Sequence, residues 1–93
     1  DDVDRRAIYL AEGLGHAFLA LSETATVVYL CSTPYNPVAE HGIQPLDPGL
    51  AIPWPADLEP LLSKKDAAAP SLTEAQSAGL LPSHDDCLAA YRD

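Results

Sequence analysis

The chain has 93 residues, a formal net charge of -9 at pH 7 and a hydrophobic fraction of 47%, which suits one small domain. Fourteen acidic residues stand against five basic ones, with no basic stripe, so nucleic acid and anionic membranes are excluded as expected partners. No apolar run is long enough to span a bilayer, and the acidic start does not resemble a secretion signal, so we expect a cytoplasmic protein.

The first half of the chain predicts β-structure. Apolar runs occupy residues 6–10, 16–21 and 25–31, and the last of these is rich in β-branched residues. Two glycines in "AEGLG" suit a turn between the first two runs, and the polar "SET" separates the second from the third. We therefore expect three adjacent antiparallel strands.

The second and third predicted strands are apolar on both faces, which favours a sandwich or barrel over an exposed sheet. If Ser22 and Glu23 form a two-residue hairpin loop, His16 lies opposite Tyr29. A slip of one residue would separate the two side chains, so this register is a hypothesis.

Residues 33–60 contain seven of the nine prolines. Proline fixes φ and lacks an amide hydrogen, so this segment predicts extended stretches and tight turns and no helix. The segment should link the predicted strands to the end of the chain.

Two short helices are predicted in the last quarter. Ser71 is a candidate N-cap, Glu74 its capping-box partner and Gly79 the stop signal. Ser83 and Asp86 repeat the same start signal.

Cysteine and histidine usage gives no sign of a disulfide scaffold or a metal centre. Cys31 and Cys87 are too few for a scaffold and are expected to be reduced. His16, His41 and His84 are scattered, without the close spacing of zinc ligands. We expect no bound metal.

Candidate catalytic residues are ambiguous when considered alone. A tyrosine in mid-strand, such as Tyr29, is more often a core residue than a catalyst, and His16 at a strand start favours a structural role. Lys65 and Asp66 suit a solvated loop, with Asp66 capping a turn. No spacing between these residues predicts a site.

Two motifs change this interpretation. "EGLGHAFLALSETATVVYL" and "LSKKDAAAP", with "PYNPVAEHGI" between them, occur in the order and spacing typical of the dTDP-4-dehydrorhamnose 3,5-epimerase family, which the chain resembles over residues 6–70. The resemblance implies a mainly β, cupin-type jelly roll, here its C-terminal half, in a homodimer without metal or organic cofactor. It also implies epimerisation of a dTDP-linked 4-keto-6-deoxyhexose at C3, C5 or both.

The resemblance also assigns roles to single residues. Tyr29 matches the proton donor, and Asp66 matches the aspartate that hydrogen-bonds the catalytic histidine. Lys65 and Glu40 match substrate contacts, His16 a ligand-contacting histidine and Tyr35 the tyrosine that stacks on thymine. The resulting candidate site comprises Tyr29 and Asp66 as catalytic residues and His16, Tyr35, Glu40 and Lys65 as substrate-binding residues.

The family's catalytic histidine belongs to an N-terminal "LRGLHxQ" segment that has no match here. We expect residues 1–62 to form C-terminal strands of a jelly roll and residues 63–93 an active-site segment with a helical tail. The chain would be part of a longer epimerase and inactive alone. The alternatives are a non-catalytic nucleotide-sugar binding or oligomerisation half-domain, and a structural β-domain.

Overall fold

The computed structural model describes residues 3–91. Residues 1–2 and 92–93, at the outer ends of the predicted segments 1–62 and 63–93, lie outside this range. No helix in the described part is long and apolar enough to cross a membrane. Regular structure within it consists of the 3₁₀-helix η1 (Pro48–Leu50) and the α-helices α1 (Lys64–Ala67), α2 (Leu72–Ser77) and α3 (His84–Ala90).

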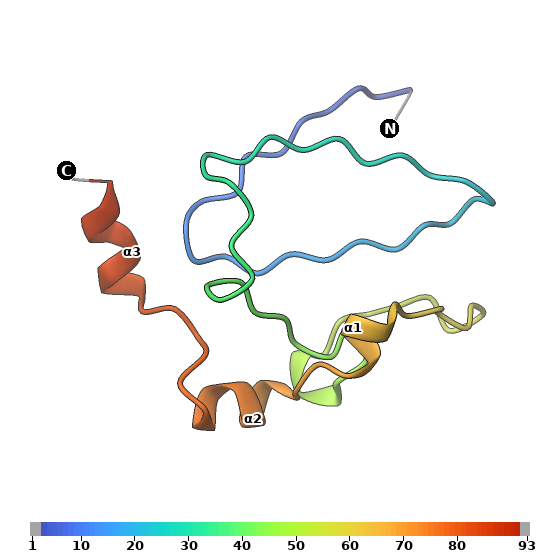
Figure 1. Ribbon diagram of the computed structural model, residues 1–93. Coiled ribbons are helices and arrows are strands. Elements are labelled where there is room, and N and C mark those ends of the chain that lie inside the picture. The colour runs from blue at the N-terminus through green and yellow to red at the C-terminus, as the bar shows by residue number, and fades with distance from the viewer. Residues whose placement is uncertain (1–2, 92–93) are drawn as a thin grey trace.

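The prediction of a mainly β, cupin-type jelly roll is wrong, because residues 3–91 contain no β-strand. Segments 16–21 and 25–31 are extended arms that stand apart and meet at a tip (Figure 1). Extended backbone becomes a sheet only when N–H and C=O groups pair with a neighbouring strand, and no backbone hydrogen bond joins residues 16–21 to residues 25–31. Their apolar side chains are largely exposed, as at Phe18 and Leu30.

The chain does reverse direction at the predicted turn. The backbone bends at Ser22 and Glu23, and the Ser22 hydroxyl donates to the Thr24 carbonyl over 2.6 Å. The predicted pairing of His16 with Tyr29 is not formed, because it requires a ladder between the arms. A polar break therefore placed the turn correctly, but burial on both faces, which would stabilise a ladder, is missing from the described residues.

Both predicted helices are confirmed with their caps. In α2 the Ser71 hydroxyl accepts the Glu74 N–H, and the Glu74 carboxylate accepts the Ser71 N–H. After α2, Gly79 has φ +71°, and the Leu80 N–H donates to the Ala75 carbonyl over 3.0 Å, which is the pattern of a Schellman C-cap. The Ser83 hydroxyl accepts the Asp86 N–H at the start of α3.

Helix α1 replaces the predicted loop around Lys65 and Asp66. The Ser63 hydroxyl accepts the Asp66 N–H over 3.1 Å and begins the helix. The sequence signal is the same serine followed three residues later by an acid that begins α3. Residues 33–60 contain no α-helix, as predicted, although η1 forms one 3₁₀ turn there.

The best-packed region joins η1 to α2. The Asp47 carboxylate accepts the Leu72 N–H over 2.7 Å and the Gly49 N–H over 3.0 Å, so one side chain links both helices. The indole N–H of Trp54 donates to the Pro45 carbonyl over 2.8 Å. Ala75, 1% exposed, is the one buried residue within the described range.

We expect Asp47 to titrate below its ordinary pKa of 3.8, because the hydrogen bonds from Leu72 and Gly49 favour the carboxylate and outweigh the small opposing effect of burial. A depressed pKa in the folded state means that this contribution to stability is complete above the ordinary pKa and is lost as the pH falls through the lower folded value. The Leu72 amide resonance, followed by NMR during acidification, should therefore move only below pH 3.8.

Asp47→Asn is the control, because the amide cannot titrate in this range and the Leu72 resonance should then stay constant. A Leu72 resonance in the unmodified chain that moves at or above the ordinary pKa would contradict the bridging role of Asp47.

Candidate functional site

A first hollow of about 210 Å³ lies between residues 40–42 and helix α1. The Gln44 N–H donates to the Pro70 carbonyl over 2.8 Å, which joins the two sides of this hollow. Three residues predicted for the site, from distant parts of the sequence, meet there. The lining residues are Glu40, His41, Gly42, Lys65, Asp66, Ala69, Pro70 and Leu80.

Helix α1 carries Lys65 and Asp66 to the first hollow. Its Ser63 cap binds the Asp66 backbone N–H, which leaves the Asp66 carboxylate available. Asp66 is half-buried and Lys65 is exposed. Within residues 3–91, Lys65 makes no hydrogen bond or ion pair, so its ammonium group is available to an anionic ligand.

A second, larger hollow of about 730 Å³ lies on the other side of Glu40. Its volume is within the range typical of small-molecule sites. The Asn36 carbonyl accepts the N–H groups of Ala39 and Glu40, each over 3.1 Å, and this turn places Glu40 in both hollows. The residues that line the second hollow are Glu12, Thr33, Pro34, Tyr35, Asn36, Ala39 and Glu40.

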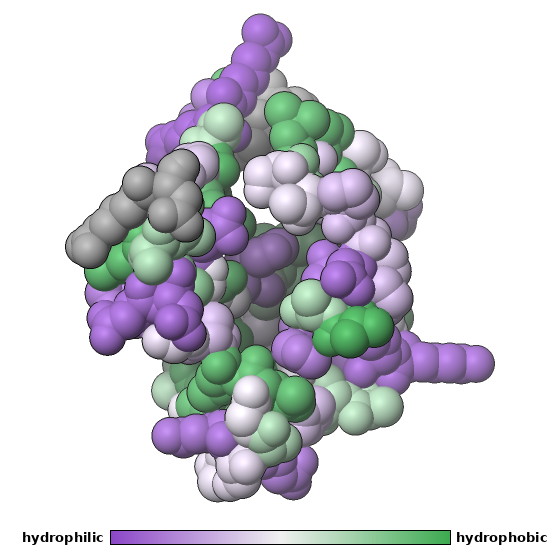
Figure 2. All heavy atoms as spheres, turned by 60° about the vertical axis from the view of Figure 1, so that its left-hand side comes forward, coloured by the Kyte–Doolittle hydropathy of each residue, from purple (hydrophilic) through white to green (hydrophobic). Residues whose placement is uncertain are grey.

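The molecule is hollowed at its centre, and both hydrophilic and hydrophobic residues are visible deep inside (Figure 2). A lining of mixed polarity can contact both the polar and the apolar groups of a ligand.

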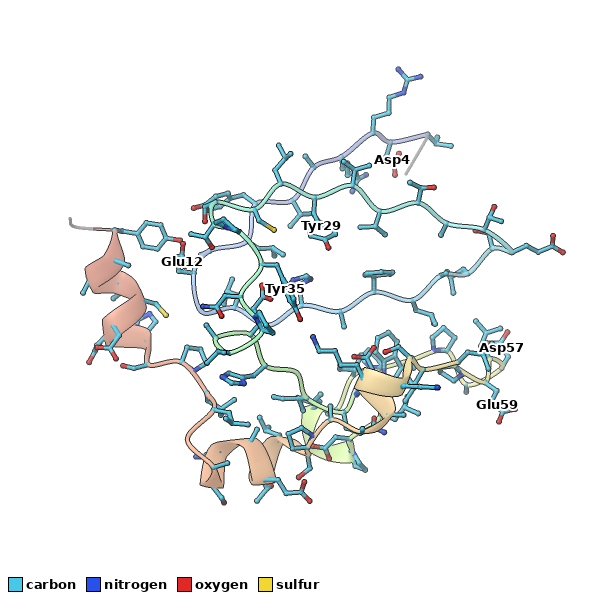
Figure 3. The ribbon with its side chains drawn as sticks, in the orientation of Figure 1. Asp4, Glu12, Tyr29, Tyr35, Asp57 and Glu59 are labelled. Atoms are coloured by element: carbon cyan, nitrogen blue, oxygen red, sulfur yellow. The ribbon has the colours of Figure 1, made fainter. Side chains whose placement is uncertain are left out.

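Tyr29 and His16 are not brought into either hollow. Tyr29 is 74% exposed, and His16 is also exposed. The Tyr29 side chain extends from its arm into the open space between the arms, above Tyr35 (Figure 3). The structure thus gathers Glu40, Lys65 and Asp66, places Tyr35 beside Glu40, and leaves the other two predicted residues apart.

Two lining residues with ionisable side chains are not among the predicted site residues. His41 follows Glu40 directly and lines the first hollow, while Glu12 comes from a turn near the start of the chain and lines the second. The position of His41 next to Glu40, a predicted substrate-binding residue, could have indicated that His41 lies at the site. No sequence signal indicated Glu12, because its position depends on contacts with residues that are distant in sequence.

The arrangement suits an anionic ligand with hydrogen-bonding groups. Lys65 and His41 can offer a cation and a ring N–H, while Glu40 and Asp66 can accept hydrogen bonds from hydroxyl groups. In residues 3–91, no group of three His, Cys, Asp or Glu side chains is placed to hold a metal ion.

Comparison with known proteins adds independent information. A family model described as dTDP-4-dehydrorhamnose 3,5-epimerase matches residues 1–74. A dTDP-4-dehydrorhamnose 3,5-epimerase of Mycolicibacterium smegmatis is 60% identical over 89 residues, which are 96% of this chain and 43% of the relative. A dTDP-4-dehydrorhamnose 3-epimerase of Streptomyces niveus is 56% identical over 96% of this chain and 42% of its own length.

A dTDP-4-dehydro-6-deoxyglucose 3-epimerase from a Streptomyces species is 57% identical over 84 residues, covering 89% of this chain and 43% of the relative. The chain thus spans less than half the length of these curated relatives. The names of these three relatives differ in the sugar and in the carbon atoms that are epimerised.

Proposed function

Because this chain belongs to the dTDP-4-dehydrorhamnose 3,5-epimerase family, we propose that it is part of an epimerase that acts on a dTDP-linked 4-keto-6-deoxyhexose. The family membership, together with the meeting of Glu40, Lys65 and Asp66 at one hollow, is the observation that supports this proposal. The complete enzyme, meaning the longer protein that would contain this chain, works as a cytoplasmic homodimer in deoxysugar biosynthesis. The net charge of -9 favours solubility.

The chemistry follows from the ketone at C4 of the sugar. A hydrogen on C3 or C5 is acidic because the electrons of the broken C–H bond move onto the C4 oxygen and form an enolate. A base removes this proton from one face, and an acid returns a proton to the same carbon from the other face. One C–H bond breaks and one forms, so the configuration inverts and no oxidant or reductant is consumed.

We assign the acid to Tyr29. We assign the base to the family's N-terminal histidine, which would donate a ring N–H to the Asp66 carboxylate. A phenol is protonated at neutral pH, since its unperturbed pKa is about 10, and the tyrosinate left after donation regains a proton from solvent. The Asp66 carboxylate fixes the tautomer of the histidine and stabilises its charged form. His16 would contact the bound ligand from the first arm.

The two hollows suit the two parts of the ligand. Lys65 in the first hollow would bind the diphosphate, because an ammonium group without a protein partner gains most from an anionic ligand. Tyr35 in the second hollow would stack on thymine, and its exposed ring has a free face for that purpose. Glu40, which lines both hollows, would accept a hydrogen bond from a hydroxyl group of the substrate.

Calorimetric titration of dTDP tests this assignment with two neighbouring lysines. Lys65→Ala should weaken binding by about tenfold or more, because it removes a charge-assisted contact with the diphosphate. Lys64→Ala is the matched control, since Lys64 lies in the same helix but does not line the first hollow. It should change the affinity by less than about twofold, as expected for a remote, solvent-screened charge.

Equal effects of the two substitutions would show that only the net charge matters and would remove the diphosphate assignment of Lys65. If dTDP binds but the complete enzyme exchanges no proton at C3 or C5 with deuterated solvent, the role is nucleotide-sugar binding without catalysis.

A further inference from the structure

The end of helix α3 is attached to a turn near the start of the chain. The Tyr91 hydroxyl accepts the Glu12 N–H over 2.7 Å, across 79 positions of sequence. Within residues 3–91, the one other hydrogen bond of this turn runs from the Leu14 N–H to the Ala11 carbonyl and is longer, at 3.4 Å. The geometry of the turn therefore depends strongly on the hydroxyl of Tyr91.

A second contact joins the same two elements. Gly13 has φ +82°, and a Cβ atom built there would lie 2.5 Å from the Cys87 sulfur. Cys87 thus occupies the space that any larger residue at position 13 would need. Helix α3 has only seven residues, which is too short for stability on its own, so contacts of this kind must fix its position.

The turn is also part of the second hollow. Glu12 lines that hollow together with Tyr35 and Glu40, and it lies at the bend that faces the end of α3 (Figure 3). A movement of the Glu12 backbone would change the shape of the space beside the Tyr35 ring. Helix α3 lies beyond residues 1–74, which the family model matches.

We propose that Tyr91 is a positioning residue for nucleotide binding, and that its hydroxyl fixes the Glu12 turn as one side of the hollow that receives dTDP. The ligand named here rests on the proposed function. The contact itself rests on the hydrogen bond to Glu12 and the fit of Cys87 against Gly13.

Tyr9 provides a reporter of this contact. Its hydroxyl lies 3.4 Å from that of Tyr91. The pKa of Tyr9 is raised first by this hydrogen bond, then by the charge that Tyr91 can carry, and to a lesser degree by burial and by the Glu12 carboxylate. Loss of the Tyr91 hydroxyl should therefore let Tyr9 ionise at lower pH.

The decisive experiment compares Tyr91→Phe with Tyr9→Phe by calorimetry with dTDP and by NMR of the Glu12 amide. Tyr91→Phe should shift the Glu12 amide resonance, lower the pH at which the Tyr9 ring signals titrate, and weaken dTDP binding about fivefold, the usual effect of one neutral hydrogen bond. Tyr9→Phe leaves the Glu12 contact intact and should change affinity by less than about twofold.

Two glycine variants test the same contact independently. Gly13→Ala introduces a side chain where the Cys87 sulfur lies, in a backbone conformation that alanine disfavours, and it should weaken dTDP binding at least as much as Tyr91→Phe. Gly15→Ala is the matched control, because nothing lies within 4 Å of the position that its Cβ would take. Its affinity should equal that of the unmodified chain.

If Tyr91→Phe shifts the Glu12 amide resonance but leaves dTDP affinity unchanged, Tyr91 does not position the nucleotide site. If the Glu12 amide resonance does not shift, the contact itself is absent and the proposal is also overturned. If the complete enzyme binds no dTDP, the proposed function fails. In that case a Glu12 shift in Tyr91→Phe would still support the contact between α3 and the turn, so the two failures are distinguishable.

Discussion

Tyr29→Phe should lower the turnover of the complete enzyme by about a thousandfold and leave dTDP affinity within about twofold, because it removes a transferable proton and keeps the ring. Turnover is measured as formation of the epimerised product, because loss of deuterium from C3 or C5 reports only proton abstraction by the base. Rate and affinity separate in this way only if the hydroxyl acts in the transition state and not in ground-state binding.

Tyr35→Phe provides the comparison. Tyr35 has an exposed ring in the second hollow, and stacking needs the ring and not the hydroxyl. Turnover should therefore be almost unchanged. If Tyr29→Phe weakened dTDP binding as much as turnover, Tyr29 would be a structural residue and the proton donor would have to be sought elsewhere.

Asp66→Asn should lower kcat of the complete enzyme by at least about 100-fold, because the amide fits the same space but cannot stabilise a charged histidine. Helix α1 should persist, since Asp66 joins its cap through the backbone N–H and not through the side chain. A carboxylate that accepts a hydrogen bond from the base would raise the pKa of that base, so its removal should lower this pKa. The acid limb of the profile of kcat/KM against pH should then move to lower pH.

Asp57→Asn is the control for this substitution. Asp57 lies in a turn at residues 56–57, lines neither hollow, and stands at the outer end of its loop (Figure 3). It should leave both kcat and the pH profile unchanged. If Asp66→Asn leaves turnover and the acid limb of the kcat/KM profile unchanged, Asp66 is a solvated surface charge and not a positioning residue.

Local signals made the helices predictable. Ser71, Glu74 and Gly79 give the start and end of α2 within a few residues of sequence, and Ser83 gives the start of α3. The same signal at Ser63 begins α1, but the lysines and the aspartate around it suggested a loop. Capping is a short-range interaction, so the sequence alone contains most of what determines it.

The extended arms were not predictable in the same way. Residues 16–21 and 25–31 have the composition of strands, but a sheet also requires a partner for each backbone group and a cover for each apolar face. The described residues supply neither, as the exposure of Phe18 and Leu30 shows. Strand composition therefore predicted an extended backbone and could not predict a ladder.

The candidate site also contains residues that local sequence could predict and contacts that it could not. Lys65 and Asp66 are adjacent in sequence, so their shared location followed from one motif, and the structure adds Glu40 and His41 to the same hollow. The bond between Glu12 and Tyr91 spans nearly the whole chain. No periodicity or motif predicts a single contact at such a separation, because it depends on how every intervening segment is placed.

Among residues 3–91, Glu40 is the one lining residue shared by the two hollows. A ligand group that moves this side chain in one hollow also changes the shape and the charge of the other. If each hollow binds one part of a ligand, the two free energies of binding should be linked, since additivity holds only for sites without common partners. Sugar selectivity and nucleotide affinity would then be a single property of this molecule, adjusted together by one carboxylate.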